Sequence, residues 1–120
     1  MTNIVQYQQG DVIFTKINNL NNNYIKNTVD EQGSKLIIAE GEATGHHHRF
    51  ELKDEVNANV NITAYTRSWS NDPVALSILG GSATIIHEEH NPLTIPEGNY
   101  EVSFVREMDH VSRVTRRVID

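Results

Sequence analysis

The chain has 120 residues and a mass of 13.6 kDa, enough for one domain that buries its own apolar core. It contains no cysteine, which excludes disulfides, thiolate metal sites and cysteine nucleophiles. The net charge is −6 without a basic stripe, and no apolar run approaches the roughly 20 residues of a membrane span, so we expect neither a nucleic-acid nor a membrane partner.

Residues branched at Cβ dominate the composition: Val, Ile and Thr number 32, against 14 for Leu, Ala and Met. Such side chains favour the pleated surface of a sheet over a helix. Short runs separated by Gly, Asn, Asp and Pro predict one all-β domain over residues 1–120, a small barrel or sandwich of about eight or nine strands. The runs lie at residues 12–17, 24–29, 36–39, 46–53, 58–65, 74–79, 82–87, 92–95, 100–104 and 111–119.

Turn residues divide these runs. Gln9-Gly10-Asp11 predicts a turn before the first strand, an Asn-rich loop of unassigned role covers 18–23, and Gly80-Gly81 predicts a tight hairpin.

In 58–65 the alternation predicts even-numbered residues facing the core, whereas Asn57 and the other odd-numbered residues face water. We expect Trp69, in a polar loop, to pack over one end of the fold, with stacking on a sugar or base as the alternative.

Five of the six histidines fall into two groups, His46-His47-His48 and His87-Glu88-Glu89-His90. Side chains two apart on a strand share a face, so His46 and His48 lie on the apolar face with Phe50 and Leu52, while His47 faces outward. The same rule places His87 with Ala83 and Ile85, whereas the direction of His90 stays open because the chain turns there.

The two groups predict a metal site if both strand ends reach the same mouth of the fold. Imidazole nitrogens with one carboxylate and no sulfur suit Zn, Mn, Fe or Ni. The predicted ligands are His46, His48, His87 and His90, with Glu89 as a further ligand or proton acceptor. A hydrogen-bonded histidine and carboxylate network without metal, and plain surface polarity, are the two alternatives.

The His-x-His pair followed by a distant His loosely resembles the pattern of the cupins, small β-barrels that hold a metal. Cupins place a glutamate four or five positions after the second His, whereas Glu51 follows His48 by three and lies on the opposite face. The second glycine-proline box is also missing around His87. The comparison therefore serves for geometry and not for membership.

A closer resemblance is to a small, uncharacterised β-rich family of bacterial and bacteriophage proteins, and it spans most of the chain. It rests on Tyr7-Gln8-Gln9-Gly10-Asp11-Val12, on Ala39-Glu40-Gly41-Glu42-Ala43-Thr44-Gly45-His46 with His48, and on His87-Glu88-Glu89-His90, Pro92-Leu93, Ile95-Pro96, Gly98, Tyr100, Val102, Arg106-Glu107 and Arg116-Arg117-Val118. This resemblance implies that these positions matter but implies no activity.

The sequence thus favours a histidine-rich protein that binds a divalent metal and leaves open whether it is an enzyme. The alternative is a non-enzymatic structural or interaction module, such as an accessory protein of a phage capsid or tail. As partners we expect a homo-oligomer or a larger protein assembly. The first residues lack the basic start and apolar stretch of a secretory signal, which predicts the cytoplasm of a bacterial or phage-infected cell, or the virion under the alternative.

Overall fold

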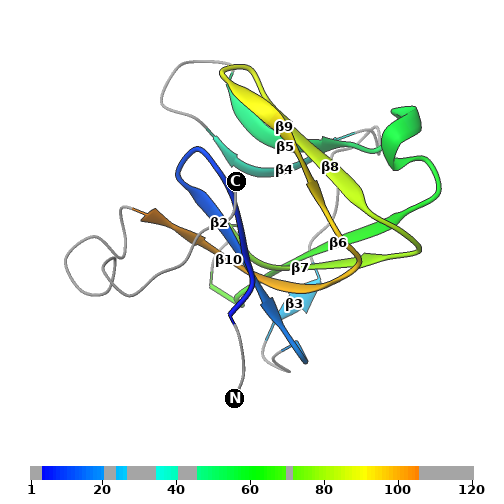
Figure 1. Cartoon of the computed structure of the whole chain (residues 1–120). Helices are drawn as coiled ribbons and strands as arrows, with labels where there is room; N and C mark the ends of the chain where they lie inside the picture. Colours follow the sequence, from blue (N-terminus) through cyan, green and yellow to red (C-terminus); the bar gives the residue numbers. More distant parts are fainter. Residues whose placement is uncertain (1–3, 21–23, 27–34, 41–45, 70–71, 106–120) are drawn as a thin grey trace.

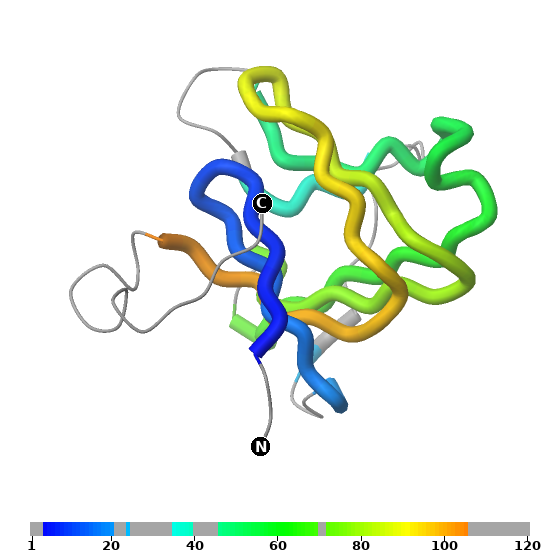
Figure 2. Tube along the Cα trace, in the orientation of Figure 1, coloured from blue at the N-terminus to red at the C-terminus, as the bar shows by residue number. Residues whose placement is uncertain are grey.

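Two antiparallel β-sheets packed face to face build the computed structural model of the protein (Figure 1, Figure 2). The structure describes residues 4–20, 24–26, 35–40, 46–69 and 72–105. The elements are β1 (Gln6–Gln9), β2 (Val12–Ile17), β3 (Ile25–Lys26), β4 (Lys35–Glu40), β5 (His47–Glu51), the short 3-10 helix η1 (Glu55–Asn57), β6 (Asn61–Thr66), β7 (Pro73–Leu79), β8 (Ala83–His87), β9 (His90–Ile95) and β10 (Gly98–Phe104). The all-β prediction is confirmed in its sandwich form, because the sheets do not close into a barrel.

The larger sheet has the strand order β1-β2-β10-β7-β6-β3, and the smaller one has the order β4-β5-β8-β9. In Figure 1 the smaller sheet lies above the larger one, with the yellow β8–β9 turn at the top. The turn predicted at Gly80-Gly81 is present, but the tight hairpin predicted there is wrong: β7 and β8 belong to different sheets, so the turn carries the chain from one sheet to the other. Both glycines have positive φ, 94° and 147°, which only glycine adopts without strain.

The core lies between the facing sides of the sheets. Phe14, Leu76 and Tyr100 from the larger sheet and Phe50 and Ile85 from the smaller one are fully buried. Burying an aliphatic or aromatic side chain of this size contributes about 1.5–3 kcal/mol. The core therefore holds the two layers together and fixes the strands that carry the histidines.

The face assignments made from residue parity are confirmed for β5 and β8. His48 and Phe50 are buried, whereas His47, Arg49 and Glu51 between and beside them are only half-buried. In β8 the buried residues are Ala83, Ile85 and His87.

The alternation predicted for 58–65 is wrong at its start. Ala58 is exposed, and β6 begins only at Asn61, because η1 occupies the preceding residues. Asn57 is 2 % exposed instead of facing water: its side-chain amide donates to the carbonyls of Glu51 and Thr84, and its oxygen accepts from the Thr84 backbone N–H. These hydrogen bonds make burial of the polar side chain favourable.

Other differences concern the ends of elements. The sequence missed β1, whose Gln-rich stretch carries no branched residue, and β9 begins at His90 and not at 92. Of the run 24–29, only β3 lies in the described part, and the predicted strand 111–119 lies outside the described residues. So do residues 21–23 of the Asn-rich loop and residues 41–45 before the first histidine.

Trp69 does not pack over an end of the sandwich, because its side chain is 77 % exposed. The prediction of a packing role is wrong.

Within the described part of the chain, no helix has the length and apolar character needed to cross a membrane.

Candidate functional site

Four imidazole rings gather at one end of the smaller sheet, and we refer to His46, His48, His87 and His90 as the histidine cluster. His46 directly precedes β5, His48 lies on β5, and His87 and His90 flank the β8–β9 turn. The ring centroids of His48 and His87 are 4.3 Å apart, those of His87 and His90 4.8 Å apart, and both the His48–His90 and the His46–His87 pairs 5.8 Å apart. Segments about 40 residues apart in sequence therefore meet, because β5 pairs with β8.

Gln9, the last residue of β1, fixes the orientation of the His48 ring. Its amide nitrogen donates to the carbonyls of Ile85 and Asn91 at 3.0 and 2.9 Å, so its oxygen is the atom left to accept. That oxygen lies 2.9 Å from His48 Nδ1, which must therefore carry a proton. In the neutral ring, Nε2 of His48 then holds a free lone pair.

The lone pair is present at neutral pH because the imidazole resists protonation. Burial, and then the neighbouring His87, lower the pKa of His48 from its ordinary value of 6.5 to about 4, although Asp11 opposes the shift. Burial and the nearby His90 also lower the pKa of His87. Both buried rings are consequently uncharged at pH 7.

His87 has the opposite tautomer, because its Nδ1 accepts a hydrogen bond of 3.0 Å from the backbone N–H of Glu89. The neutral ring therefore carries its proton on Nε2. This bond closes the two-residue turn between β8 and β9, across which His87 and His90 stand opposite each other. In this arrangement His87 is a hydrogen-bond acceptor and donor, with no lone pair left over.

The nitrogen Nδ1 of His46 is the one buried side-chain nitrogen or oxygen of the described residues without a hydrogen-bond partner. The nearest charged oxygen is Oε2 of Glu89, at 3.6 Å, which is too far for a hydrogen bond. An unsatisfied buried polar atom costs about 1–3 kcal/mol, so a partner for this nitrogen would be stabilising.

Glu88 ties the β8–β9 turn to β5 from the outside. Its carboxylate accepts from the His47 backbone N–H at 3.0 Å and from the Arg49 guanidinium at 2.7 Å. The hydrogen bond from His47 and the charge of Arg49 lower the pKa of Glu88 to about 2. The turn that carries His87 and His90 is thereby attached to the strand that carries His48.

The β1–β2 turn brings the larger sheet up to the histidine cluster. Asp11 Oδ1 lies 3.8 Å from His48 Nε2. Gly10 has a φ of 61°, and a Cβ placed on it would lie 2.6 Å from His90 Nε2 and 3.2 Å from His48 Cε1. The close approach of this turn to the two rings therefore requires glycine at position 10.

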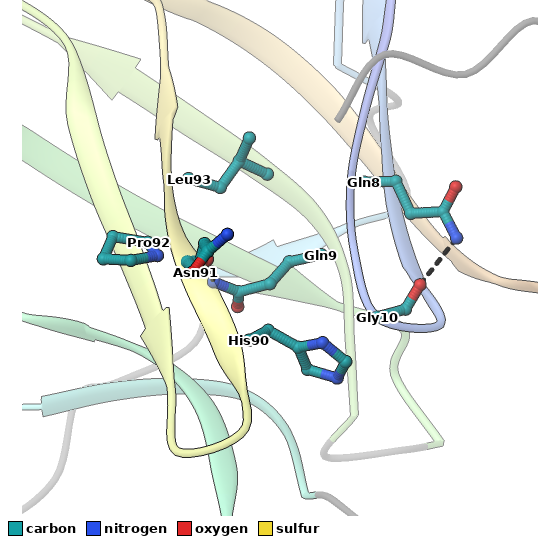
Figure 3. A pocket seen from close by; sticks show the side chains of 7 residues that line it. All are labelled: Gln8, Gln9, Gly10, His90, Asn91, Pro92 and Leu93. Atoms are coloured by element: carbon teal, nitrogen blue, oxygen red, sulfur yellow. Dashed lines mark hydrogen bonds between the residues drawn. The ribbon is translucent and has the colours of Figure 1, made fainter.

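A pocket of about 560 Å³ opens beside His90, between the β1–β2 turn and β9 (Figure 3). Its lining contains no carboxylate, lysine or arginine side chain and is rich in amides: Gln8, Gln9, Gly10, His90, Asn91, Pro92 and Leu93. Figure 3 shows the His90 ring directed toward the turn that contains Gly10. A small molecule in this pocket would therefore reach the edge of the histidine cluster.

The distances between the four rings are compatible with a shared metal ion. The directions in which their nitrogen atoms point are less compatible with one. Metal–nitrogen bonds of about 2 Å place the ring centres of two ligands roughly 5 Å apart, close to the distances in the cluster. Among the described residues, however, no group of three or more His, Asp or Glu side chains is arranged to hold an ion. Nδ1 of His87, for example, is already occupied by the hydrogen bond from the Glu89 N–H.

The sequence singled out Gln9, Gly10 and Asp11 through the family resemblance, but it did not place them at the histidine cluster. Their pattern predicts a turn, and the turn is present between β1 and β2. Its approach to the histidines depends on how the two sheets pack, which the spacing of residues along one chain does not report.

Comparison with known proteins gives a family without an assigned activity. No curated protein and no solved structure matches the chain. A family model described as a domain of unknown function, DUF8820, matches residues 8–104, a range that includes every histidine of the cluster and the β1–β2 turn. The chain therefore belongs to the DUF8820 family.

Proposed function

We propose that the histidine cluster binds one divalent transition-metal ion, with zinc as the first candidate and manganese, iron and nickel as others. The observation that carries this proposal is the Gln9–His48 hydrogen bond, which leaves the unprotonated Nε2 of a buried, neutral imidazole beside two other rings, those of His87 and His90. Histidine ligands of metal ions commonly donate their second ring N–H to an oxygen in this way.

The ligands follow from the atoms that each ring has available. His48 offers Nε2, with Asp11 Oδ1 3.8 Å away. His46 offers its unpartnered Nδ1 on the side of Glu89. His90 has its Nε2 against the β1–β2 turn, beside the pocket.

His87 is a different case, since it becomes a ligand only if it gives up the hydrogen bond from the Glu89 N–H. An ion shared by these groups would satisfy the buried nitrogen of His46 and offset the crowding of neutral imidazoles.

The test is calorimetric titration of chelator-treated protein with Zn²⁺, Mn²⁺, Fe²⁺ and Ni²⁺, followed by thermal unfolding with and without each ion. We expect one ion per chain and a rise in melting temperature, because a ligand that binds only the folded state stabilises it. His48→Ala should abolish metal binding, since it removes Nε2 and its available lone pair.

His47→Ala is the matched control, because His47 is the next residue on the same strand and its side chain lies on the other face. It should bind metal as the wild type does. A folded wild-type protein that takes up none of the four ions, with an unchanged melting temperature, contradicts the proposal.

The same titration separates metal binding from the alternative of a structural or interaction module, including a phage virion accessory. That alternative is supported by the hydrogen bonds that already satisfy His48 and His87 without an ion. It predicts no metal uptake and, in addition, a homo-oligomer or a larger assembly in sedimentation experiments.

A further inference from the structure

A second pocket, of about 420 Å³, lies on the larger sheet, in which β3, β6, β7 and β10 are found. It is formed where the segments around the ends of these strands meet, away from the β8–β9 turn (Figure 1). None of its lining residues belongs to the histidine cluster. The residues that matter for its chemistry are Tyr24, Arg67, Trp69, Asp72 and Glu101.

Arg67 lies close to two aromatic rings that line this pocket. Its guanidinium carbon is 5.7 Å from the centre of the Trp69 ring and 6.0 Å from that of Tyr24, within the range of a cation–π contact. The three side chains form one amphipathic cluster, in which the Trp69 side chain is 77 % exposed. The indole therefore contributes little to the core, and its ring is open to stacking by a ligand.

The charged side chains around the two aromatic rings restrict the chemical class of that ligand. Asp72 and Glu101 place two carboxylates in the lining against the single cation Arg67, and the whole chain is acidic. A polyanion such as a nucleic acid is therefore disfavoured, since its binding depends on neutralising phosphates with basic side chains. Carboxylates accept hydrogen bonds from hydroxyl groups, and the apolar face of a sugar ring stacks on an indole.

We propose that this pocket is a binding site for a neutral oligosaccharide, with one sugar ring stacked on Trp69 and its hydroxyl groups bonded by Asp72, Glu101 and Arg67. The inference is independent of metal binding, because the two sites share no residue.

Trp69 is the only tryptophan of the chain, so indole fluorescence reports this pocket alone. The experiment titrates the protein with maltotriose, cellotriose and the trisaccharide of N-acetylglucosamine, with adenosine as a planar aromatic competitor. We expect a saturable change in the Trp69 emission with at least one trisaccharide at millimolar concentrations.

Calorimetry on variants then tests the assignment. Trp69→Ala should weaken binding of that trisaccharide roughly tenfold or more, and Trp69→Phe should retain part of it because a ring remains. Leu79→Ala removes another exposed apolar side chain outside the pocket and should leave binding unchanged.

The proposal is overturned if no trisaccharide gives a saturable change, if Trp69→Ala binds as the wild type does, or if adenosine binds more tightly than every sugar.

Discussion

The side-chain amide of Gln9 determines the tautomer of His48, the most deeply buried histidine of the cluster. Because both donors of Gln9 are used by backbone carbonyls, its oxygen must accept, and His48 must donate from Nδ1. Sequence parity predicted correctly that His48 points inward, since neighbouring residues on a strand alternate between faces. It did not predict the tautomer, which depends on Gln9 from a strand that the sequence missed.

The lowered pKa of His48 makes stability depend on pH. In the unfolded chain the imidazole takes up a proton near pH 6.5, whereas in the folded protein it does so only near pH 4. The contribution of the neutral ring to stability is therefore full above pH 6.5 and is lost as the pH falls from 6.5 to 4. The loss amounts to about 3 kcal/mol, since each pH unit between the two values costs about 1.4 kcal/mol.

Urea unfolding in the presence of a chelator at pH 7.5, 5.5 and 4 measures this loss. His48→Gln should remove most of the pH dependence between pH 6.5 and 4, whereas His47→Gln should retain it. An equal slope in His48→Gln and the wild type would show that other groups cause the acid destabilisation.

At the scale of elements, the β8–β9 hairpin and β5 act as one unit. Besides the β5–β8 pairing, two side chains hold it together: the exposed carboxylate of Glu88 and the buried amide of Asn57. The hydrophobic pattern predicted β5 and β8 because their buried residues alternate strictly. It failed at η1, where a polar side chain is buried because its hydrogen bonds are satisfied, and hydropathy does not report such bonds.

Asn57→Ala should destabilise the protein by about 3 kcal/mol, because the Thr84 N–H and two carbonyls lose their buried partner. Chemical denaturation gives the difference in the free energy of unfolding. The exposed neighbour Asn59 serves as the control, and Asn59→Ala should change stability by less than about 0.5 kcal/mol. Equal effects of the two substitutions would mean that the hydrogen bonds of Asn57 contribute nothing.

At the scale of the molecule, the two sheets are joined by their apolar core and, at one end, by Gln9. This residue belongs to the larger sheet but bonds β8, β9 and His48 of the smaller one. The all-β class followed from composition and turn spacing, which left a barrel and a sandwich both open. How the sheets are superposed did not follow, because pairing between distant strands is set by packing in three dimensions.

Replacing Gln9 tests this connection. Gln9→Leu keeps the size of the side chain but leaves two carbonyls and the His48 N–H without a partner, so we expect a loss of about 3 kcal/mol in denaturant unfolding. Metal affinity should fall about 10–100-fold, since His48 loses its orientation. Gln8→Leu removes a single contact within the turn and should change neither quantity by a comparable amount.

Because Gly10 has no side chain, the two sheets come close together at the end that carries the histidine cluster. Gly10 belongs to the larger sheet's turn, and His90 belongs to the smaller sheet, with no room for even a methyl group between them. A larger residue there would displace the His90 ring or push the β1–β2 turn away from it. Position 10 is thus a point at which the packing of the histidine end can be altered without replacing a single imidazole.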